Sequence, residues 1–280
     1  MPGSEAESPV RRERPPGTGR QEERAESSER EMRLRRKAED MDTMEITVDG
    51  RQLGLYGDPG SGSFFLQPVD EHDASLMESE AAALAERCGH GEWCIVTIPV
   101  DNWNEDLTPW KNAPVFGREG FGDGAQRTLD YICGSVIPCL EEQLPADKRS
   151  YYLCGYSLAG LFALWGGYQT DAFAGVAGVS PSVWYPGWRE YAAQHEVKTD
   201  RVYLSLGLKE EKTRNRVMAA VGDAIRDQYS LLLERGIQTV LEWNPGNHFV
   251  DSDSRMAKGL AWLLERKIRP EAGIQDDETE

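Results

Sequence analysis

From residue 43 onward, short β-type runs of hydrophobic residues alternate with longer segments in which hydrophobic residues recur at helical spacing. The β-type runs are Glu45–Val48, Ser63–Gln67, Cys94–Val100, Tyr151–Gly155, Gly175–Val179, Val202–Leu206 and Thr239–Trp243. Strands that alternate with helices in this way favour βαβ units. The pattern therefore predicts an α/β fold with a mainly parallel central sheet and helices on both of its faces.

Three segments place hydrophobic residues on one face of a helix. The three faces are Ala125, Leu129, Ile132, Val136 and Leu140; Met218, Val221, Ile225, Tyr229 and Leu232; and Met256, Leu260, Leu263 and Leu264. The earliest β-type runs are separated by Asp49–Gly50 and by Gly57–Gly62, which favours antiparallel strands at one edge of the sheet. Functional residues are expected in the loops beyond the carboxyl ends of the parallel strands.

The two ends of the chain differ in composition from the middle. Residues 1–42 are rich in charge and proline and hold no aromatic side chain, which predicts a disordered charged N-terminal tail. Residues 43–268 are predicted to form one domain, and residues 269–280 an acidic C-terminal tail. The first forty residues carry ten acidic and ten basic side chains, so the net charge of -17 lies wholly in the rest of the chain.

This negative charge narrows the choice of partners. Phosphate contacts need Lys and Arg, so neither nucleic acid nor an anionic membrane is expected as a partner. An acidic surface that only keeps the protein in solution is the simpler interpretation of the same charge. The sequence shows neither the apolar core of a signal peptide nor an apolar run long enough to span a membrane. We therefore expect a cytoplasmic protein.

The five cysteines form no CxxC pair and no Cys/His cluster. This pattern favours a reducing compartment and argues against a disulfide framework or a structural zinc site. Rather than as metal ligands, the acidic segment 70–73 is interpreted as a solvated turn before a helix, and 251–254 as a helix N-terminus with one of its own residues as the cap. No metal and no cofactor are expected, and the sequence does not indicate an oligomeric state.

A candidate nucleophile follows the run Tyr151–Gly155, in the segment Gly155-Tyr156-Ser157-Leu158-Ala159-Gly160. A serine between a buried strand and an apolar helix can sit on a tight turn with its hydroxyl presented at the sheet edge, and small residues on either side let the backbones approach. The Leu158 backbone N–H would then stabilise an oxyanion. A turn serine without a catalytic role is the alternative, because the short motif alone is a weak signal.

A serine nucleophile needs a base, and His248 is the best placed of the four histidines. It lies in a loop with Pro245 and Gly246, directly after the last predicted strand. The third member of a triad should be a carboxylate after the preceding strand, where either Glu210 or Glu211 could serve. The order serine, glutamate, histidine is the one found in α/β-hydrolases rather than in the trypsin-like or subtilisin-like proteases.

At this point the chain resembles the putative-esterase group of the α/β-hydrolases, which includes esterase D and the enterobactin-type siderophore esterases. The resemblance covers roughly residues 44–268. It rests on the elbow GYSLAG, on Asn102–Trp110, on Val179–Trp184 and on Gly246-Asn247-His248. One departure is Ala159, which stands where a glycine is commoner.

The resemblance implies an α/β-hydrolase fold without a large lid domain, and a serine esterase that works through a Ser–His–Glu triad and an acyl-enzyme. It favours Glu210 over Glu211, because relatives often show G-x-x-E after the penultimate strand, although some relatives manage with a Ser–His dyad. It also implies a second oxyanion donor from the backbone of Asn102 or Trp103. A thioesterase, a siderophore-ester hydrolase and a non-catalytic scaffold of the same fold are the alternatives.

The expected substrate is a small-molecule ester. The aromatic side chains expected around its pocket are Trp103, Trp110, Tyr156, Trp184 and Trp243. Of the four tryptophans among them, only two are expected to line it. The negative charge of the domain favours neutral or cationic esters, unless a cation such as Lys111 or Lys209 lines the cleft.

Overall fold

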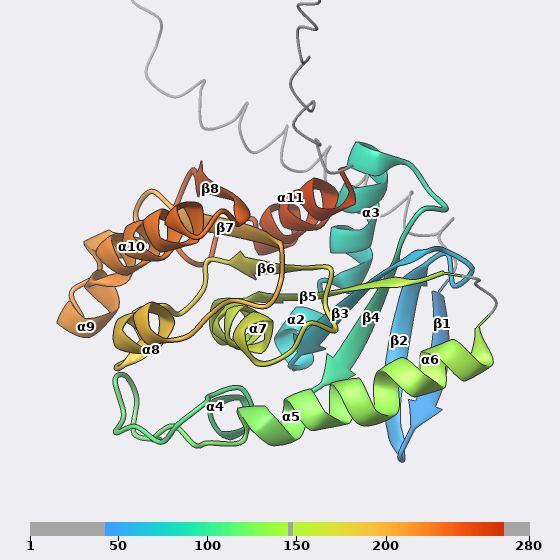
Figure 1. Cartoon of the computed structure of the whole chain (residues 1–280), viewed down its shortest axis with the longest axis horizontal. Helices are drawn as coiled ribbons and strands as arrows, with labels where there is room; N and C mark the ends of the chain where they lie inside the picture. The colour runs from blue at the N-terminus through green and yellow to red at the C-terminus, as the bar shows by residue number, and fades with distance from the viewer. Residues whose placement is uncertain (1–42, 145–147, 266–280) are drawn as a thin grey trace, which may run out of the picture.

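The structure is a computed structural model that describes residues 43–144 and 148–265. In these residues an eight-stranded sheet of order β1-β2-β4-β3-β5-β6-β7-β8 is covered by helices (Figure 1). The strands are β1 (Thr43–Val48), β2 (Arg51–Gly57), β3 (Ser63–Val69), β4 (Cys94–Pro99), β5 (Ser150–Tyr156), β6 (Gly175–Val179), β7 (Arg201–Gly207) and β8 (Gln238–Asn244). The predicted α/β class is confirmed. The tails predicted at 1–42 and 269–280 lie outside the described residues.

The helices lie in the connections from β3 onward and after β8. They are α2 (Glu71–Ala74), α3 (Met77–Cys88), α4 (Trp103–Asp106), α5 (Ala125–Tyr131), the π-helix η1 (Ile132–Val136), α6 (Ile137–Gln143), α7 (Ser157–Gln169), α8 (Trp188–Gln194), the 3₁₀ turn η2 (Glu210–Lys212), α9 (Arg216–Ala219), α10 (Val221–Glu234) and α11 (Ser252–Leu264). None of the helices in the described part of the chain has the length and apolar character needed to cross a membrane.

The sheet is antiparallel only at one edge. β1 pairs with β2 through a turn in which Asp49 and Gly50 both have positive φ, the backbone of a tight hairpin. β2 then pairs antiparallel with β4, and every further pair from β4 through β8 is parallel. The predicted antiparallel edge is thus confirmed for the hairpin at Asp49–Gly50, but it is wrong for the strand after Gly57–Gly62: β3 lies between β4 and β5 and pairs parallel with both. All parallel strands point the same way, so their carboxyl ends share one edge of the sheet.

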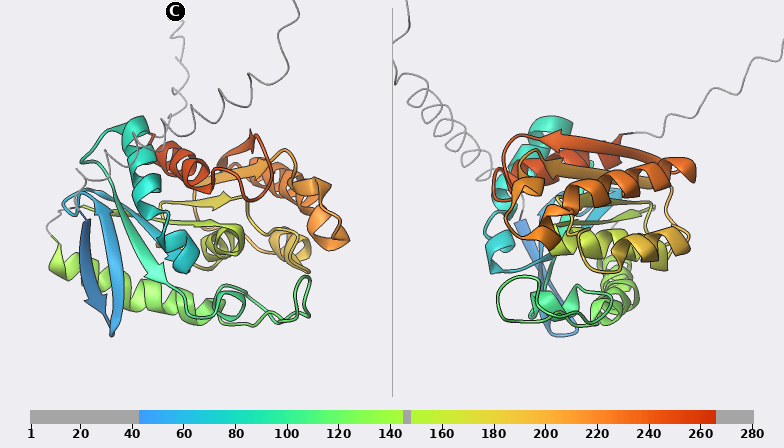
Figure 2. Two further views of the ribbon diagram at one scale, coloured as in Figure 1. Left: turned by 180° about the vertical axis from the view of Figure 1, so that it is seen from behind. Right: turned by 90° about the vertical axis from the view of Figure 1, so that its left-hand side faces the viewer.

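The core lies in two layers, one on each face of the sheet. On β5, Tyr151 and Leu153 belong to the layer under α5, α6, α7 and α10, whereas Cys154 and Tyr156 belong to the layer under α3 and α11. This division follows from the alternation of side chains along a strand. In the views of Figure 2, α3 and α11 lie side by side on their face.

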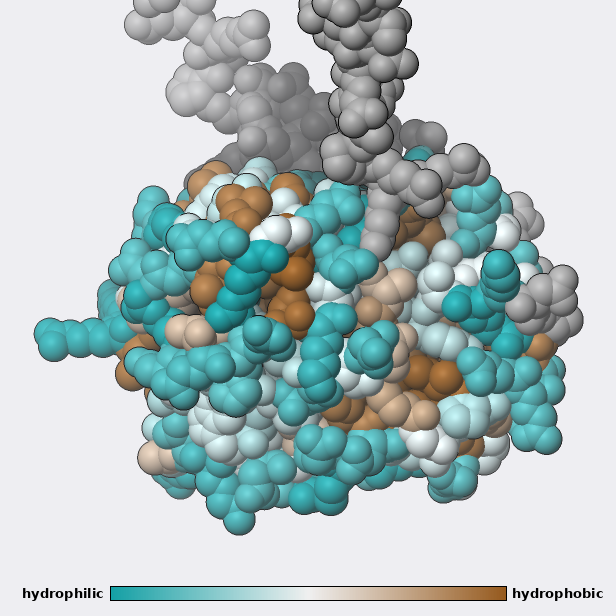
Figure 3. Space-filling view, viewed as in Figure 1, coloured by the Kyte–Doolittle hydropathy of each residue, from teal (hydrophilic) through white to brown (hydrophobic). Residues whose placement is uncertain are grey.

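The outer surface of the helices is mostly hydrophilic. Figure 3 shows polar side chains over most of the face seen in Figure 1, with hydrophobic residues gathered in small patches.

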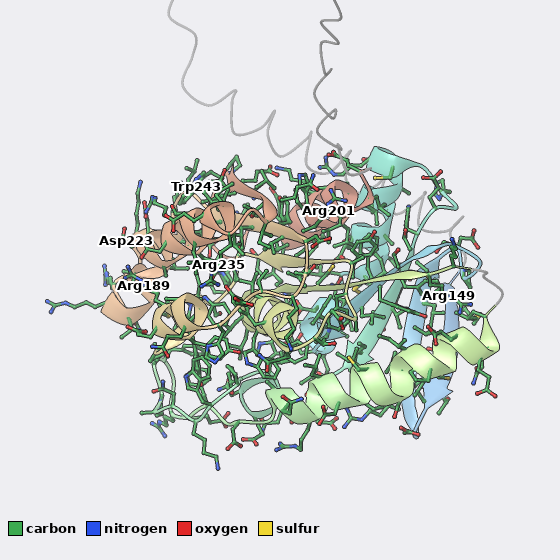
Figure 4. All side chains as sticks on the ribbon, in the orientation of Figure 1. Arg149, Arg189, Arg201, Asp223, Arg235 and Trp243 are labelled. Carbon is green, nitrogen blue, oxygen red and sulfur yellow. The ribbon has the colours of Figure 1, made fainter. Side chains whose placement is uncertain are left out.

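At the end of α11, Arg201 of β7 donates to the carbonyl oxygens of Leu263 and Trp262 at 2.8 Å each (Figure 4). These bonds satisfy carbonyl groups that have no partner within the helix. They tie α11 firmly to the parallel sheet.

Candidate active site

Ser157 lies on a strained turn at the carboxyl end of β5, as the first residue of α7. Its φ of 56° falls in the left-handed region, which non-glycine residues rarely adopt. The turn is possible only because Gly155 has no side chain: a Cβ there would lie 2.4 Å from the backbone carbonyl group of Ala159. The local sequence therefore forces the tight strand-to-helix turn that presents the serine hydroxyl at the sheet edge.

His248 reaches the serine from the loop that follows β8. Its Nε2 atom lies 2.9 Å from the Oγ atom of Ser157. Gly246, with φ of 90°, lets the loop turn back over the sheet edge. The Tyr156 hydroxyl donates to the His248 carbonyl oxygen at 2.7 Å, so the residue before the serine fixes the histidine backbone.

Glu210 lies behind His248, and Glu211 does not. The His248 Nδ1 atom lies 2.8 Å from Glu210 Oε2. The Glu211 carboxylate instead pairs with Arg226 at 3.0 Å on the surface. The single 3₁₀ turn η2 explains the difference, because neighbouring residues on such a turn point to different sides.

The other carboxylate oxygen of Glu210 accepts three hydrogen bonds. Oε1 accepts from the Gly207 backbone N–H at 2.7 Å, from Ser180 Oγ at 2.8 Å and from Arg255 Nη1 at 3.1 Å. Burial alone would raise the pKa of Glu210, but the hydrogen bonds and the charge of neighbouring groups, His248 first among them, outweigh burial and lower this pKa. The carboxylate is therefore held in its ionised form.

Arg255 contacts three parts of this site: the turn at Ser157, Glu210 and the loop that carries His248. It lies on α11 and is only 2% exposed. Besides Glu210, its guanidinium donates to the Tyr156 hydroxyl at 3.2 Å and to the carbonyl oxygens of Pro245 and Asn247 at 2.8 and 2.9 Å. One buried cation thus connects the elbow, the glutamate and the histidine loop. Arg255 was not among the residues predicted for the site.

Two backbone groups were predicted to bind an oxyanion beside Ser157. Leu158 lies in the first turn of α7 and lines the cleft. The Asn102 N–H donates to the Asp106 carboxylate at 3.1 Å, so it is engaged elsewhere. Trp103 begins α4 and lines the cleft, and N–H groups in a first helical turn have no acceptor within the helix. Of the two residues predicted for the second donor, Trp103 is better placed.

A cleft of about 730 Å³ opens in front of Ser157 and His248. Besides Ser157, Leu158, Glu210 and His248, its lining consists of Trp103, Phe116, Ser180, Pro181, Ser182, Trp184, Lys209, Lys212, Thr213, Met218, Val221, Asn247 and Phe249. Of the four tryptophans named for the pocket, Trp103 and Trp184 line this cleft. Phe116, Met218 and Phe249 were not predicted, although the position of Phe249 directly after His248 was a signal for it.

Three residues predicted to line the pocket lie elsewhere, and that part of the prediction is wrong. Trp110 donates to the Pro186 carbonyl oxygen at 2.8 Å and packs against Tyr185. Tyr156 is buried behind the site, where its hydroxyl serves the histidine loop. The ring centroid of Trp243 lies 4.7 Å from the guanidinium carbon of Arg226, near α10 (Figure 4).

The acidic segments 70–73 and 251–254 lie at the starts of α2 and α11. Asp70 is the N-cap of α2, and its carboxylate accepts from the Asp73 backbone N–H at 2.8 Å. Across residues 43–144 and 148–265, no group of three or more histidine, cysteine or acidic side chains is arranged to hold a metal ion. The five cysteines, all within the described ranges, are free thiols.

Solved structures with the same fold include several hydrolases. The siderophore hydrolase EstA of Aspergillus nidulans is 19% identical, with a TM-score of 0.61 over 80% of this chain and 93% of that chain. An IroE-like serine hydrolase of Shewanella oneidensis is 16% identical, with a TM-score of 0.64 over 79% of each chain. The enterobactin esterase Fes of Shigella flexneri is 15% identical, with a TM-score of 0.56 over 80% of this chain and 59% of that chain.

At these identities the likeness shows the fold, which is that of the α/β-hydrolase-like esterases. Among curated proteins, none matches the chain. The family model described as "Putative esterase" matches residues 73–248, from the short helix after β3 to the histidine beside Ser157. This match spans more than half of the chain, and the chain therefore belongs to the putative esterase family.

Proposed function

We propose that the protein is a serine hydrolase that cleaves carboxylic esters through Ser157, His248 and Glu210. The observation that carries this proposal is the unbroken chain of contacts from Ser157 Oγ through both ring nitrogens of His248 to Glu210 Oε2, at 2.9 and 2.8 Å. A serine with a positive φ at a strand-to-helix turn, facing a cleft, supports the same role.

The first step is attack of Ser157 Oγ on the ester carbonyl carbon. His248 Nε2 accepts the hydroxyl proton, and ionised Glu210 stabilises the resulting imidazolium and holds the ring with Nδ1–H directed toward it. The negative charge that develops on the carbonyl oxygen is stabilised by the backbone N–H groups of Leu158 and Trp103. His248 then gives its proton to the leaving alcohol, and the acyl group stays on the serine.

Water completes the cycle. His248 accepts a proton from a water molecule that attacks the acyl-enzyme, and returning this proton to Ser157 Oγ releases the acid. The cleft is open enough to admit both water and substrate: it holds about 730 Å³ and its aromatic walls come from loops and short helices. No cofactor enters any step of this scheme.

Hydrolysis of a panel of p-nitrophenyl esters, compared between the wild type and Ser157→Ala, tests this function. The wild type should turn over at least one ester, and Ser157→Ala should lose about 10⁴-fold or more in kcat. Equal turnover by both proteins would exclude Ser157 as the nucleophile. Failure of the wild type on all esters, with a correctly folded protein, would favour a non-catalytic scaffold.

The panel should extend to thioesters and to siderophore esters. Two of the three solved structures described above carry the name siderophore hydrolase or enterobactin esterase, which makes siderophore esters a second class of candidate substrate. The aromatic side chains Trp103, Phe116 and Trp184 around the cleft suit a substrate with an aromatic or apolar portion. The highest kcat/KM across the panel identifies the preferred class.

A further inference from the structure

The turn that carries Glu210 also carries two lysines, Lys209 and Lys212. The Lys212 backbone N–H donates to the Lys209 carbonyl oxygen at 3.1 Å, which is the i to i+3 bond of a 3₁₀ turn. Side chains three residues apart eclipse one another on such a turn. Both lysines accordingly line the cleft in front of Ser157. The sequence Lys-Glu-Glu-Lys thus places both lysines at the cleft and one glutamate beside His248.

The charge of the cleft is opposite to that of the molecule. Lys209, Lys212 and Glu210 are the charged residues among those that line it in the described structure. Glu210 is buried and already compensated by Arg255 at 3.1 Å. The accessible charge of the cleft is therefore positive, in a chain whose formal net charge is -17.

The two lysines have no carboxylate partner among the described residues. The neighbouring Glu211 is already paired with Arg226, at 3.0 Å. Two like charges on one side of a turn repel each other, and a nearby anion relieves this repulsion. The arrangement suits a ligand that brings its own negative charge.

The charge of the two lysines affects a ligand in the cleft more than the net charge of the whole protein does. At an ionic strength of 0.1 M, charges farther than about 10 Å are largely screened, so the acidic surface acts weakly inside the cleft. The lysines border the same cleft as Ser157 and His248, where a bound ester must lie. Around them, Trp103, Phe116 and Met218 supply apolar walls.

We propose that the enzyme selects esters that carry an anionic group beside an apolar portion, with Lys209 and Lys212 as the residues that bind the anion. This inference rests on the proposed esterase function. It reverses the preference for neutral or cationic esters that the net charge favours, because a lysine does line the cleft. Lys111, the other cation considered for this role, does not.

Matched ester pairs test the proposal. In the first pair, the mono-p-nitrophenyl ester of adipic acid is compared with p-nitrophenyl hexanoate, which places the charge on the acyl side. In the second, the hexanoate ester of 4-hydroxybenzoate is compared with that of 4-hydroxybenzamide, which places it on the alcohol side. The anionic member of one pair should have a kcat/KM about three- to tenfold higher at low salt, and the advantage should shrink in 0.5 M NaCl.

The double variant Lys209→Gln, Lys212→Gln should lower this anionic-to-neutral ratio toward one. The ratio is the readout because both esters use the same triad, so any effect of the substitutions on Glu210 cancels. Lys148→Gln is the matched control: Lys148 is exposed and precedes β5, at the end of the strand opposite Ser157. This control should leave the ratio unchanged.

The outcomes separate this proposal from the one on which it rests. Hydrolysis that depends on Ser157 but shows no preference in either pair overturns the anion selectivity alone. The same holds for a preference that the double variant leaves intact. Hydrolysis that persists in Ser157→Ala overturns the proposed function instead.

Discussion

Arg255 Nη1 lies 3.1 Å from the Oε1 atom of Glu210, while the Oε2 atom of the same carboxylate contacts His248. The guanidinium is almost fully buried on α11 and also binds carbonyl oxygens of the loop that carries His248. A buried carboxylate is stable only when it is paired and hydrogen-bonded. We infer that Arg255 is a positioning residue, which keeps Glu210 ionised and the histidine loop in place.

Replacing Arg255 should cost both stability and activity. Arg255→Met leaves Glu210 as a buried charge without its ion-pair partner, so the free energy of unfolding should fall by about 3–5 kcal/mol, and kcat with it. Urea denaturation and ester hydrolysis measure the two effects. Arg189→Met is the control: Arg189 is exposed and pairs with exposed Asp227, and its loss should cost under about 1 kcal/mol.

A merely structural role would affect stability alone. If Arg255 acts through Glu210, the apparent pKa of the acid limb of kcat should differ between Arg255→Lys, which keeps the charge, and Arg255→Met. Identical pH profiles in the two variants would limit Arg255 to a structural role.

Glu210 and Glu211 should respond very differently to the same substitution. Glu210→Gln removes the carboxylate that orients and stabilises His248, so kcat should fall by about 10²–10⁴-fold. Glu211→Gln loses only a partly exposed ion pair with Arg226 and should change kcat less than about twofold. Steady-state hydrolysis of one ester by both variants decides the matter. A Glu210→Gln enzyme with wild-type kcat would point to a Ser–His dyad.

The tight turn at Ser157 should tolerate no side chain at position 155. In Gly155→Ala, the new methyl group would collide with the backbone of Ala159, so the turn must open and the serine must shift. We expect a loss of about 1–3 kcal/mol in stability and a larger loss in kcat. Gly134→Ala serves as the control, because nothing lies within 4 Å of a Cβ there. Equal melting temperatures and equal hydrolysis rates for the two variants would refute the tight packing at Gly155.

Glu80 should make the protein less stable as the pH rises. Burial, aided by the charges of Asp73 and Asp253, raises the pKa of Glu80 to about 8. The folded state therefore holds a proton that the unfolded state releases near the ordinary pKa of a glutamate, about 4.3. Below that pH, protonated Glu80 makes its full contribution to the free energy of unfolding. This contribution falls by about 1.4 kcal/mol per pH unit as the pH rises toward 8.

Glu80→Gln, a neutral residue at all pH values, measures this effect. Its stability relative to the wild type should rise between pH 5 and pH 7.5, as followed by urea denaturation. Glu78→Gln, on the exposed side of the same helix, should show no such trend. Parallel curves for the wild type and Glu80→Gln would mean that Glu80 is not protonated in the folded protein.

Much of the fold followed from hydrophobic periodicity. Buried parallel strands such as β6 and β7 are short apolar runs between polar loops, so their positions were predicted within a residue at each end. Helix ends were harder. The face from Met218 to Leu232 suggested one helix, but Asn215 caps a separate short helix, α9, whose N-terminal N–H groups bind its side chain.

The candidate site was predictable where topology decides it. Ser157, His248 and the pair Glu210–Glu211 each follow a parallel strand, and parallel strands end at one edge of the sheet. The choice between the two glutamates depends on the direction of each side chain on a single 3₁₀ turn, which residue types alone do not specify.

Arg255 was missed because a charged residue near the start of a helix suggests an exposed position. The signal for its burial was its spacing: Arg255, Gly259 and Leu263 lie four residues apart, on one buried stripe of α11. The wrongly placed Trp110 and Trp243 show the converse, because a large aromatic residue near a loop packs against neighbouring side chains as readily as it lines a pocket.

If Ser157 is an activated nucleophile, a fluorophosphonate should react with it, and peptide mass spectrometry of the labelled protein locates the adduct. We expect a single adduct on Ser157, with labelling abolished in Ser157→Ala and strongly slowed in His248→Ala. A folded wild-type protein that takes up no label, or a Ser157→Ala variant that is labelled as fast as the wild type, would contradict it.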